Sequence, residues 1–174
     1  MRNTAFLAFG IGLLILQSIL HVIIDRLHVA NVTPNLLLPL VVFMGVHEYS
    51  MARGAALSFI LGYLFDVFAG APVGLFTAIS VATFVVARFA GVRLAAQTLL
   101  TKVALAFVFA LFQGILVVTL TAILGNDPSR AQRLASLVPA DAIAAAIFAP
   151  LVFRFAERIH IATTSAQAEG QGAR

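Results

Sequence analysis

One acidic residue inside an apolar segment is the most informative candidate for chemistry in this chain. Asp66 follows Arg53 by roughly 20 Å along an expected helix, which is deep enough to place its carboxylate in the hydrocarbon layer of a membrane. An ionised carboxylate is costly there and needs a partner. Because it falls in the last turn of that helix, where the helix dipole disfavours an anion, we expect the turn at Pro72, Val73 and Gly74 to aim N–H groups of the next helix back at it.

Two roles are open to Asp66. As a structural group, its carboxylate would brace the hairpin between two helices through hydrogen bonds. As a proton relay, it would need further ionisable groups at a similar depth, and only His21 and Asp141 stand as remote candidates. We favour the structural role.

Other patterns that support catalysis or metal binding are missing from the sequence. His47 and Glu48 begin like the zinc-protease motif, but Met51 stands where the second histidine should be. The chain has no cysteine, so it has neither a thiol nucleophile nor a cysteine-ligated metal. It also has no nucleophile elbow, phosphate loop or dinucleotide fingerprint. We therefore expect no catalytic residue, metal or cofactor, and a protein that is not an enzyme.

Small residues form a stripe around Asp66. Gly54, Ser58, Gly62, Asp66 and Gly70 recur at every fourth position, so on a helix they lie on one face. In lipid, such a face lets two helix backbones approach closely. We favour packing within the protein's own bundle, and an interface with a partner protein is the alternative.

Two amide side chains lie inside other apolar segments. Gln17 belongs to the first segment and Gln113 to the fifth. Polar side chains at such positions more often hydrogen-bond between helices than contact a substrate. Both are expected to join helices.

The amino-acid composition indicates which kind of secondary structure positions these residues. The chain has 174 residues, is 61% hydrophobic and 10% charged, and has a mean hydropathy of +1.04. Soluble domains are about 45–50% apolar and about 25% charged. The net charge of +4 is not gathered with aromatic residues as in a nucleic-acid-binding surface. We therefore predict one all-α membrane domain in a lipid bilayer, with no nucleic-acid partner.

Six apolar segments are expected to form transmembrane helices in a domain over residues 1–160. Their approximate spans are 4–24, 34–47, 53–70, 72–88, 99–124 and 138–155. The second is short and contains Pro39, so it must be extended at its ends or be partly re-entrant. A loop is expected over 125–137, with Pro139 near the start of the sixth helix. The tail over 161–174 has little apolar content and is predicted to be disordered.

The distribution of basic residues predicts the orientation. On one side of a six-span topology lie eight Lys and Arg residues: Arg2, Arg53, Arg88, Arg93, Lys102, Arg154, Arg158 and Arg174. The other side holds Arg26, Arg130 and Arg133. The positive-inside rule then places both termini in the cytoplasm.

One stretch of the chain resembles a known family. It runs from Pro34, Asn35 and three leucines through Arg53-Gly54 to Gly62, Asp66, Gly70, Pro72 and Gly74-Leu75. This pattern, with the length and the six-helix layout, resembles the rod shape-determining protein MreD family. In that family Asp66 would be the signature acid of the third helix.

The resemblance implies a fold, a location and partners. The fold would be similar to the substrate-binding subunits of energy-coupling-factor vitamin transporters. The protein would be a non-enzymatic subunit of the bacterial inner membrane that supports peptidoglycan synthesis and cell shape. It would bind the single-pass protein MreC, and through it RodA and a class B penicillin-binding transpeptidase, with MreB as an indirect partner. Gly10 and the stripe residues Gly54, Ser58 and Gly62 are the candidate floor for the partner's helix.

The similarity to transporter subunits supplies the alternative function. Such a subunit binds a small vitamin-like molecule in a pocket that opens to the outside. Polar candidates for that pocket gather in the expected loop after the fifth helix: Asn126, Asp127, Ser129, Arg130, Gln132 and Arg133. The alternative therefore predicts a polar pocket and saturable ligand binding.

Overall fold

The computed structural model describes residues 2–27, 35–47, 50–69, 72–90, 98–124 and 128–172. Within these ranges the chain is all helical. The helices are α1 (Arg2–Leu27), α2 (Leu37–His47), α3 (Met51–Ala69), α4 (Leu75–Phe89), α5 (Leu99–Leu124) and α6 (Pro128–Gly172). The all-α prediction is therefore confirmed for the described residues.

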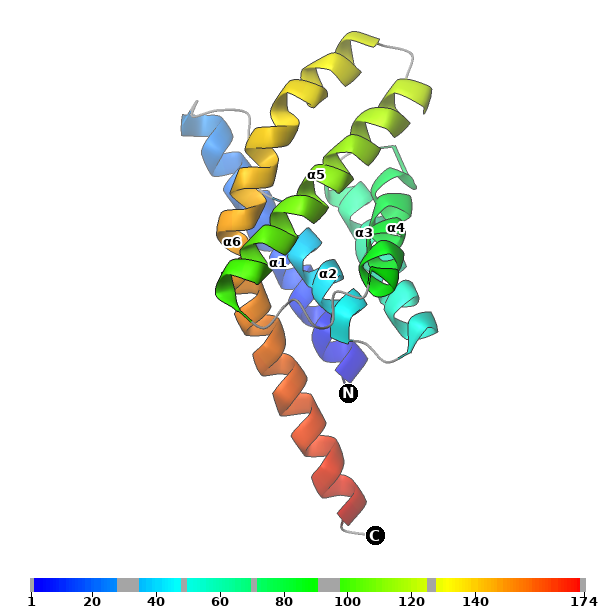
Figure 1. Cartoon of the computed structure of the whole chain (residues 1–174), viewed down its shortest axis with the longest axis vertical. Helices are drawn as coiled ribbons and strands as arrows, with labels where there is room; N and C mark the ends of the chain where they lie inside the picture. The colour runs from blue at the N-terminus through cyan, green and yellow to red at the C-terminus, as the bar shows by residue number, and fades with distance from the viewer. Residues whose placement is uncertain are drawn as a thin grey trace.

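Four helices are long and apolar enough to cross a membrane. The candidate spans are Thr4–Ile24, Met51–Ala69, Leu100–Ile123 and Ala131–Ala162, which lie in α1, α3, α5 and α6. In contrast, α2 and α4 are shorter apolar helices. The start of α1 and the end of α6 lie at the same end of the molecule, and α6 projects beyond the bundle there (Figure 1). We call this end the terminal end and the opposite end the distal end.

The shortest helix lies in the middle of the bundle (Figure 1). Every residue of α2 from Leu37 to Val46 is buried, because α2 contacts all five other helices. Pro39 lies in the first turn, where its missing N–H costs no helical hydrogen bond, so the helix forms despite the proline. At eleven residues α2 is roughly 16 Å long, far short of the ~30 Å hydrocarbon layer.

The sixth helix differs from its prediction at both ends. The sequence predicts a loop over 125–137, but α6 already begins at Pro128. Proline suits the first helical position, because its φ is fixed near the helical value and its N–H would be unpaired there. Pro139 consequently lies inside α6 instead of near its start. At the other end α6 continues to Gly172, although composition predicts disorder over 161–174, since a helix that is already nucleated adds residues at little cost.

Candidate functional site

The Asp66 side chain joins the end of α3 to the beginning of α4. Its Oδ2 atom accepts hydrogen bonds from the Gly74 N–H at 2.9 Å and from the N–H and hydroxyl of Thr77 at 3.1 and 2.6 Å. Its Oδ1 atom accepts a fourth hydrogen bond from the Phe76 N–H at 2.7 Å. The residue is only 1% exposed. The predicted bracing of the helical hairpin is confirmed, and we call this arrangement the carboxylate cap.

The local backbone explains why α3 must supply this cap. Gly74 is the N-cap residue of α4 and has φ of 99°, a left-handed conformation that favours glycine. Without a side chain it cannot accept a hydrogen bond from the first turn, as serine or aspartate would at this position. The first-turn N–H groups therefore need another acceptor, and the positive end of the α4 dipole stabilises a carboxylate there.

The small-residue stripe packs inside the bundle. A Cβ atom at Gly62 would lie 2.7 Å from the Thr77 Cα atom and 2.8 Å from the Phe76 carbonyl oxygen. Backbone cannot move aside as a flexible side chain can, so only glycine fits there. Gly54 and Ser58 are buried as well. The internal interpretation is thus confirmed for Gly54, Ser58 and Gly62, and these three positions are not open to a partner helix.

Gly10, the candidate from α1, also faces the bundle. A Cβ atom there would overlap a methyl group of Leu61 on α3. The interface between α1 and α3 therefore covers this glycine, and it too is not available to a partner.

A second set of caps holds the beginning of α2. The Asn35 Oδ1 atom accepts hydrogen bonds from the N–H groups of Leu37 at 3.1 Å and Leu38 at 3.3 Å. The Oε1 atom of Gln17, on α1, accepts a hydrogen bond from the Leu36 N–H at 3.0 Å. The expected role of Gln17 in joining helices is confirmed. Because these caps are neutral amides, we call them the amide caps.

The amide caps also fix the height of α2 in the bundle. Gln17 lies near the middle of α1, so the Gln17 hydrogen bond places the start of α2 about halfway along α1. α2 then continues toward the terminal end (Figure 1). No part of α2 fills the centre of the distal half.

A cavity of about 210 Å³ occupies this distal half. All five helices other than α2 contribute to its wall, and Asn35 lies just before α2. The residues that give it its chemical character are Gln17, Asn35, Phe65, Phe76, Gln113 and Asp141. The Phe65 and Phe76 rings pack at 4.3 Å between centroids, and aliphatic residues of α5 and α6 complete the wall. The predicted helix-joining role of Gln113 is not seen: within the described chain its side chain makes no hydrogen bond.

The remaining predicted site residues fall into two groups. Pro34 and Gly70 lie outside the described residues, and so do Asn126 and Asp127. Pro72 is exposed, and its carbonyl oxygen accepts a hydrogen bond from the Leu75 N–H in the turn before α4. Ser129, Gln132 and Arg133 lie in the first turns of α6 and are exposed, and none of them lines the cavity. The polar residues of the cavity are therefore not those that the transporter alternative suggested.

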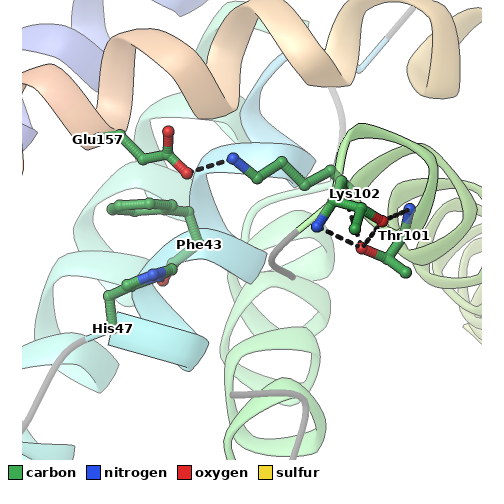
Figure 2. Close-up of polar contacts among 6 residues, drawn as sticks. Phe43, His47, Thr101, Lys102 and Glu157 are labelled. Carbon is green, nitrogen blue, oxygen red and sulfur yellow. Dashed lines mark hydrogen bonds and ion pairs between the residues drawn. The ribbon is translucent and has the colours of Figure 1, made fainter. Parts of the chain in front are cut away.

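The terminal end of the bundle has its own polar contact. Lys102 of α5 forms an ion pair with Glu157 of α6, beside Phe43 and His47 of α2 (Figure 2). The His47 ring stacks on Phe43 at 4.1 Å between centroids, and its Nδ1 atom is 3.2 Å from the Phe43 carbonyl oxygen. Thr101 hydrogen-bonds with Thr98 at the start of α5. The ion pair therefore joins α5 to α6 at the end opposite the cavity, and a ring contact between Phe43 and Phe153 joins α2 to α6.

Comparisons of the chain with protein-family models, curated proteins and solved structures found no match. The resemblance to the MreD family therefore rests on the motif residues themselves.

Sequence reasoning missed two functional details. It did not identify Thr77, which supplies two of the four hydrogen bonds to Asp66. A threonine three residues after the N-cap Gly74 does not by itself indicate a hydrogen bond to Asp66. That role is seen only when the position of the Asp66 carboxylate is known. It also did not predict the cavity, because the wall residues come from six separate stretches of the chain.

Proposed function

We propose that this protein is a non-enzymatic, multi-pass subunit of the bacterial inner membrane that binds a single-pass MreC-like protein within the bilayer. In this role it supports the cell-elongation complex of RodA, a class B penicillin-binding transpeptidase and, indirectly, MreB. The observation that carries the proposal is the α3–α4 hairpin. Its inner face is locked by the carboxylate cap, and its outer face is open.

The outer face of α3 suits a transmembrane helix as partner. Phe59, Tyr63 and Val67 follow one another at helical spacing and are 55%, 47% and 59% exposed. Phenylalanine and valine side chains are stable in contact with lipid, whereas a tyrosine hydroxyl without a hydrogen bond is unfavourable there. No hydrogen bond joins this hydroxyl to any residue that the structure describes.

The position of Tyr63 makes its hydroxyl costly in lipid. Its Cα atom is roughly 9 Å from the end of α3 at Ala69. Helical side chains tilt toward the helix N-terminus, so the ring slants away from the nearer membrane surface and into the hydrocarbon layer. A hydroxyl at that depth gains a hydrogen bond only from another protein helix. We therefore place the partner helix along Phe59, Tyr63 and Val67.

Co-purification with the MreC-like protein tests this proposal. Tyr63→Phe removes only the hydroxyl, and the loss of one interhelical hydrogen bond is worth about 0.6 to 2 kcal/mol. Retained partner should fall by roughly 3- to 30-fold in a titration of partner concentration. Tyr63→Leu, which also removes the ring, should lower the amount of retained partner further.

The matched control is Phe148→Leu on α6. Phe148 is also an outward-facing aromatic residue, at 38% exposed, but it lies on another helix. Full retention with this variant and loss with the Tyr63 variants would support the proposed face. Equal retention by all three variants would reject it, and no partner for the unmodified chain would reject the function.

We further propose six membrane crossings with both termini in the cytoplasm. Eight of the eleven Lys and Arg residues support this orientation. The chain has no native cysteine, so Thr98→Cys and Ser129→Cys each give a single reporter site, and both positions are exposed. A membrane-impermeant thiol reagent added to intact cells should label the second variant and not the first. Labelling of both would reject this topology.

A small-molecule-binding subunit of an energy-coupling-factor-type transporter is the second candidate. The cavity with its polar side chains favours it. Saturable binding of a vitamin-like ligand, together with absence of the single-pass partner, would decide for this candidate.

A further inference from the structure

The cavity follows from the length of α2. With eleven residues, and its start fixed at the height of Gln17, α2 fills only the terminal half of the bundle core. The longer helices α1, α5 and α6 continue past it and leave about 210 Å³ between them. At the volume that water takes in the liquid, this space corresponds to about seven molecules.

The amide caps leave hydrogen-bond donors on the cavity wall. The oxygen atoms of Gln17 and Asn35 are occupied by backbone N–H groups at the start of α2. Each side chain keeps an NH₂ group, and both residues line the cavity. A molecule in the cavity would therefore meet two donors at this side.

Gln113 of α5 lines the same cavity, and it also borders a small pocket with Asn35 and Leu38 at the start of α2. It is only 7% exposed, and its side chain makes no hydrogen bond to the described part of the protein. Because it lines the cavity, its amide can offer both an acceptor oxygen and an NH₂ donor group to a molecule there.

Charge and shape narrow the class of that occupant. The lining contains no Lys or Arg, and its one ionisable residue is Asp141. An anionic group in the cavity would therefore find no Lys or Arg side chain among the lining residues. The Phe65 and Phe76 rings and the aliphatic residues offer an apolar surface against which a ring can pack.

We propose that this cavity binds a small, planar, uncharged molecule that carries an amide or lactam group. The carbonyl oxygen accepts from the NH₂ groups of Gln17 and Asn35, and the Gln113 amide pairs with the remaining polar edge. The ring packs against Phe65 and Phe76. This site goes beyond the partner-binding function, because a ligand would bind in the core while the partner helix binds on the outer face of α3.

Binding of matched aromatic probes to the purified full-length chain in lipid nanodiscs tests the site. The probes are benzamide, nicotinamide and 2-pyridone, compared with benzoate as the anion and toluene as the apolar ring. We expect the amides to give saturable ligand-detected NMR signals and to raise the unfolding temperature. Benzoate and toluene should bind at least about tenfold more weakly, since each lacks the neutral amide.

Two variants connect the binding to the cavity. Gln113→Leu keeps the volume and removes the amide, and it should weaken amide binding about tenfold without improving benzoate binding. Val117→Phe fills the cavity, leaves every polar group in place, and should abolish binding of all probes. Gln132→Leu on the exposed surface of α6 is the control and should bind like the unmodified chain.

The outcomes separate clearly. Equal binding of toluene and benzamide would show that the cavity binds apolar rings without recognising the amide. Tight benzoate binding would show an anion site. Either result overturns the proposal. Absence of binding by all three amides also overturns it. None of these results bears on co-purification with a single-pass partner, so the two proposals fail separately.

Discussion

Side chains cap the N-termini of both α4 and α2, but the two caps differ in their chemistry. Asp66 accepts four hydrogen bonds at the start of α4, and both of its oxygen atoms are used. Gln17 and Asn35 accept three at the start of α2 and keep their NH₂ groups. The carboxylate cap lies in a closely packed hairpin, whereas the amide caps border a cavity.

The difference shows how the chemistry of a cap affects what surrounds it. A carboxylate has only acceptors, so a ring of donors satisfies it completely and packing can close around it. An amide also has an NH₂ group. When its oxygen accepts from the backbone, the NH₂ group still needs an acceptor. In this protein the first arrangement suits a rigid structural joint, and the second suits a site that receives a polar molecule.

The largest loss of stability should come from adding a side chain where the backbones of α3 and α4 are in contact. Gly62→Leu places its Cβ atom 2.7 Å from the Thr77 Cα atom, which must force α4 away from α3. We expect a loss of more than about 3 kcal/mol, and little monodisperse protein in size-exclusion chromatography. The control is Gly12→Leu on α1, where a Cβ atom has open space and should be tolerated. Normal folding of both variants would contradict the close packing of the hairpin.

Removing the carboxylate cap should have the next largest effect. Asp66→Leu leaves the first-turn N–H groups of α4 without an acceptor, which we expect to lower the free energy of unfolding by about 3 kcal/mol. Asp66→Asn keeps one acceptor oxygen and should cost about 1 kcal/mol. Thermal or denaturant unfolding in detergent measures both values. If Asn were as damaging to function as Leu while the protein assembled normally, a role that depends on the charge would replace the structural one.

Two threonines of α4 allow a comparison between a buried hydroxyl with a hydrogen-bond partner and one without. The Thr77 hydroxyl donates to Asp66, whereas the Thr83 hydroxyl has no partner among the described residues; the side chains are 6% and 1% exposed. Thr77→Val should therefore cost about 1 kcal/mol, while Thr83→Val should be neutral or stabilising. The same unfolding measurement tests both variants. Equal losses would mean that the hydroxyl of Thr77 adds nothing to the cap.

The ion pair at the terminal end should contribute least. Lys102 and Glu157 are 17% and 37% exposed, and exposed pairs contribute about 0.2–1 kcal/mol. A double-mutant cycle with Lys102→Met and Glu157→Gln isolates their coupling energy. We expect a value in this range that decreases with added salt. A coupling of several kcal/mol would contradict the prediction that this partly exposed ion pair is weak.

Much of the helical layout follows from local sequence. The apolar runs predict the long helices, since an apolar segment in lipid must satisfy its backbone internally as a helix. The acid in the last turn of α3, followed by Gly74, also predicts the carboxylate cap, because the donor and acceptor groups are close in the chain. The start of α6 is less predictable, because Pro128 can either begin a helix or belong to a turn.

The sequence by itself determined the helical, membrane-compatible class of this protein and the joint between α3 and α4, because both depend on residues that are near one another in the chain. Only the tertiary structure decided that the small-residue stripe faces inward, that α2 lies at the centre, and that a polar cavity remains beyond it. Those features depend on the height and rotation of each helix against its neighbours. Contacts between distant segments fix both, such as the hydrogen bond from the Leu36 N–H to Gln17, and no local pattern encodes them.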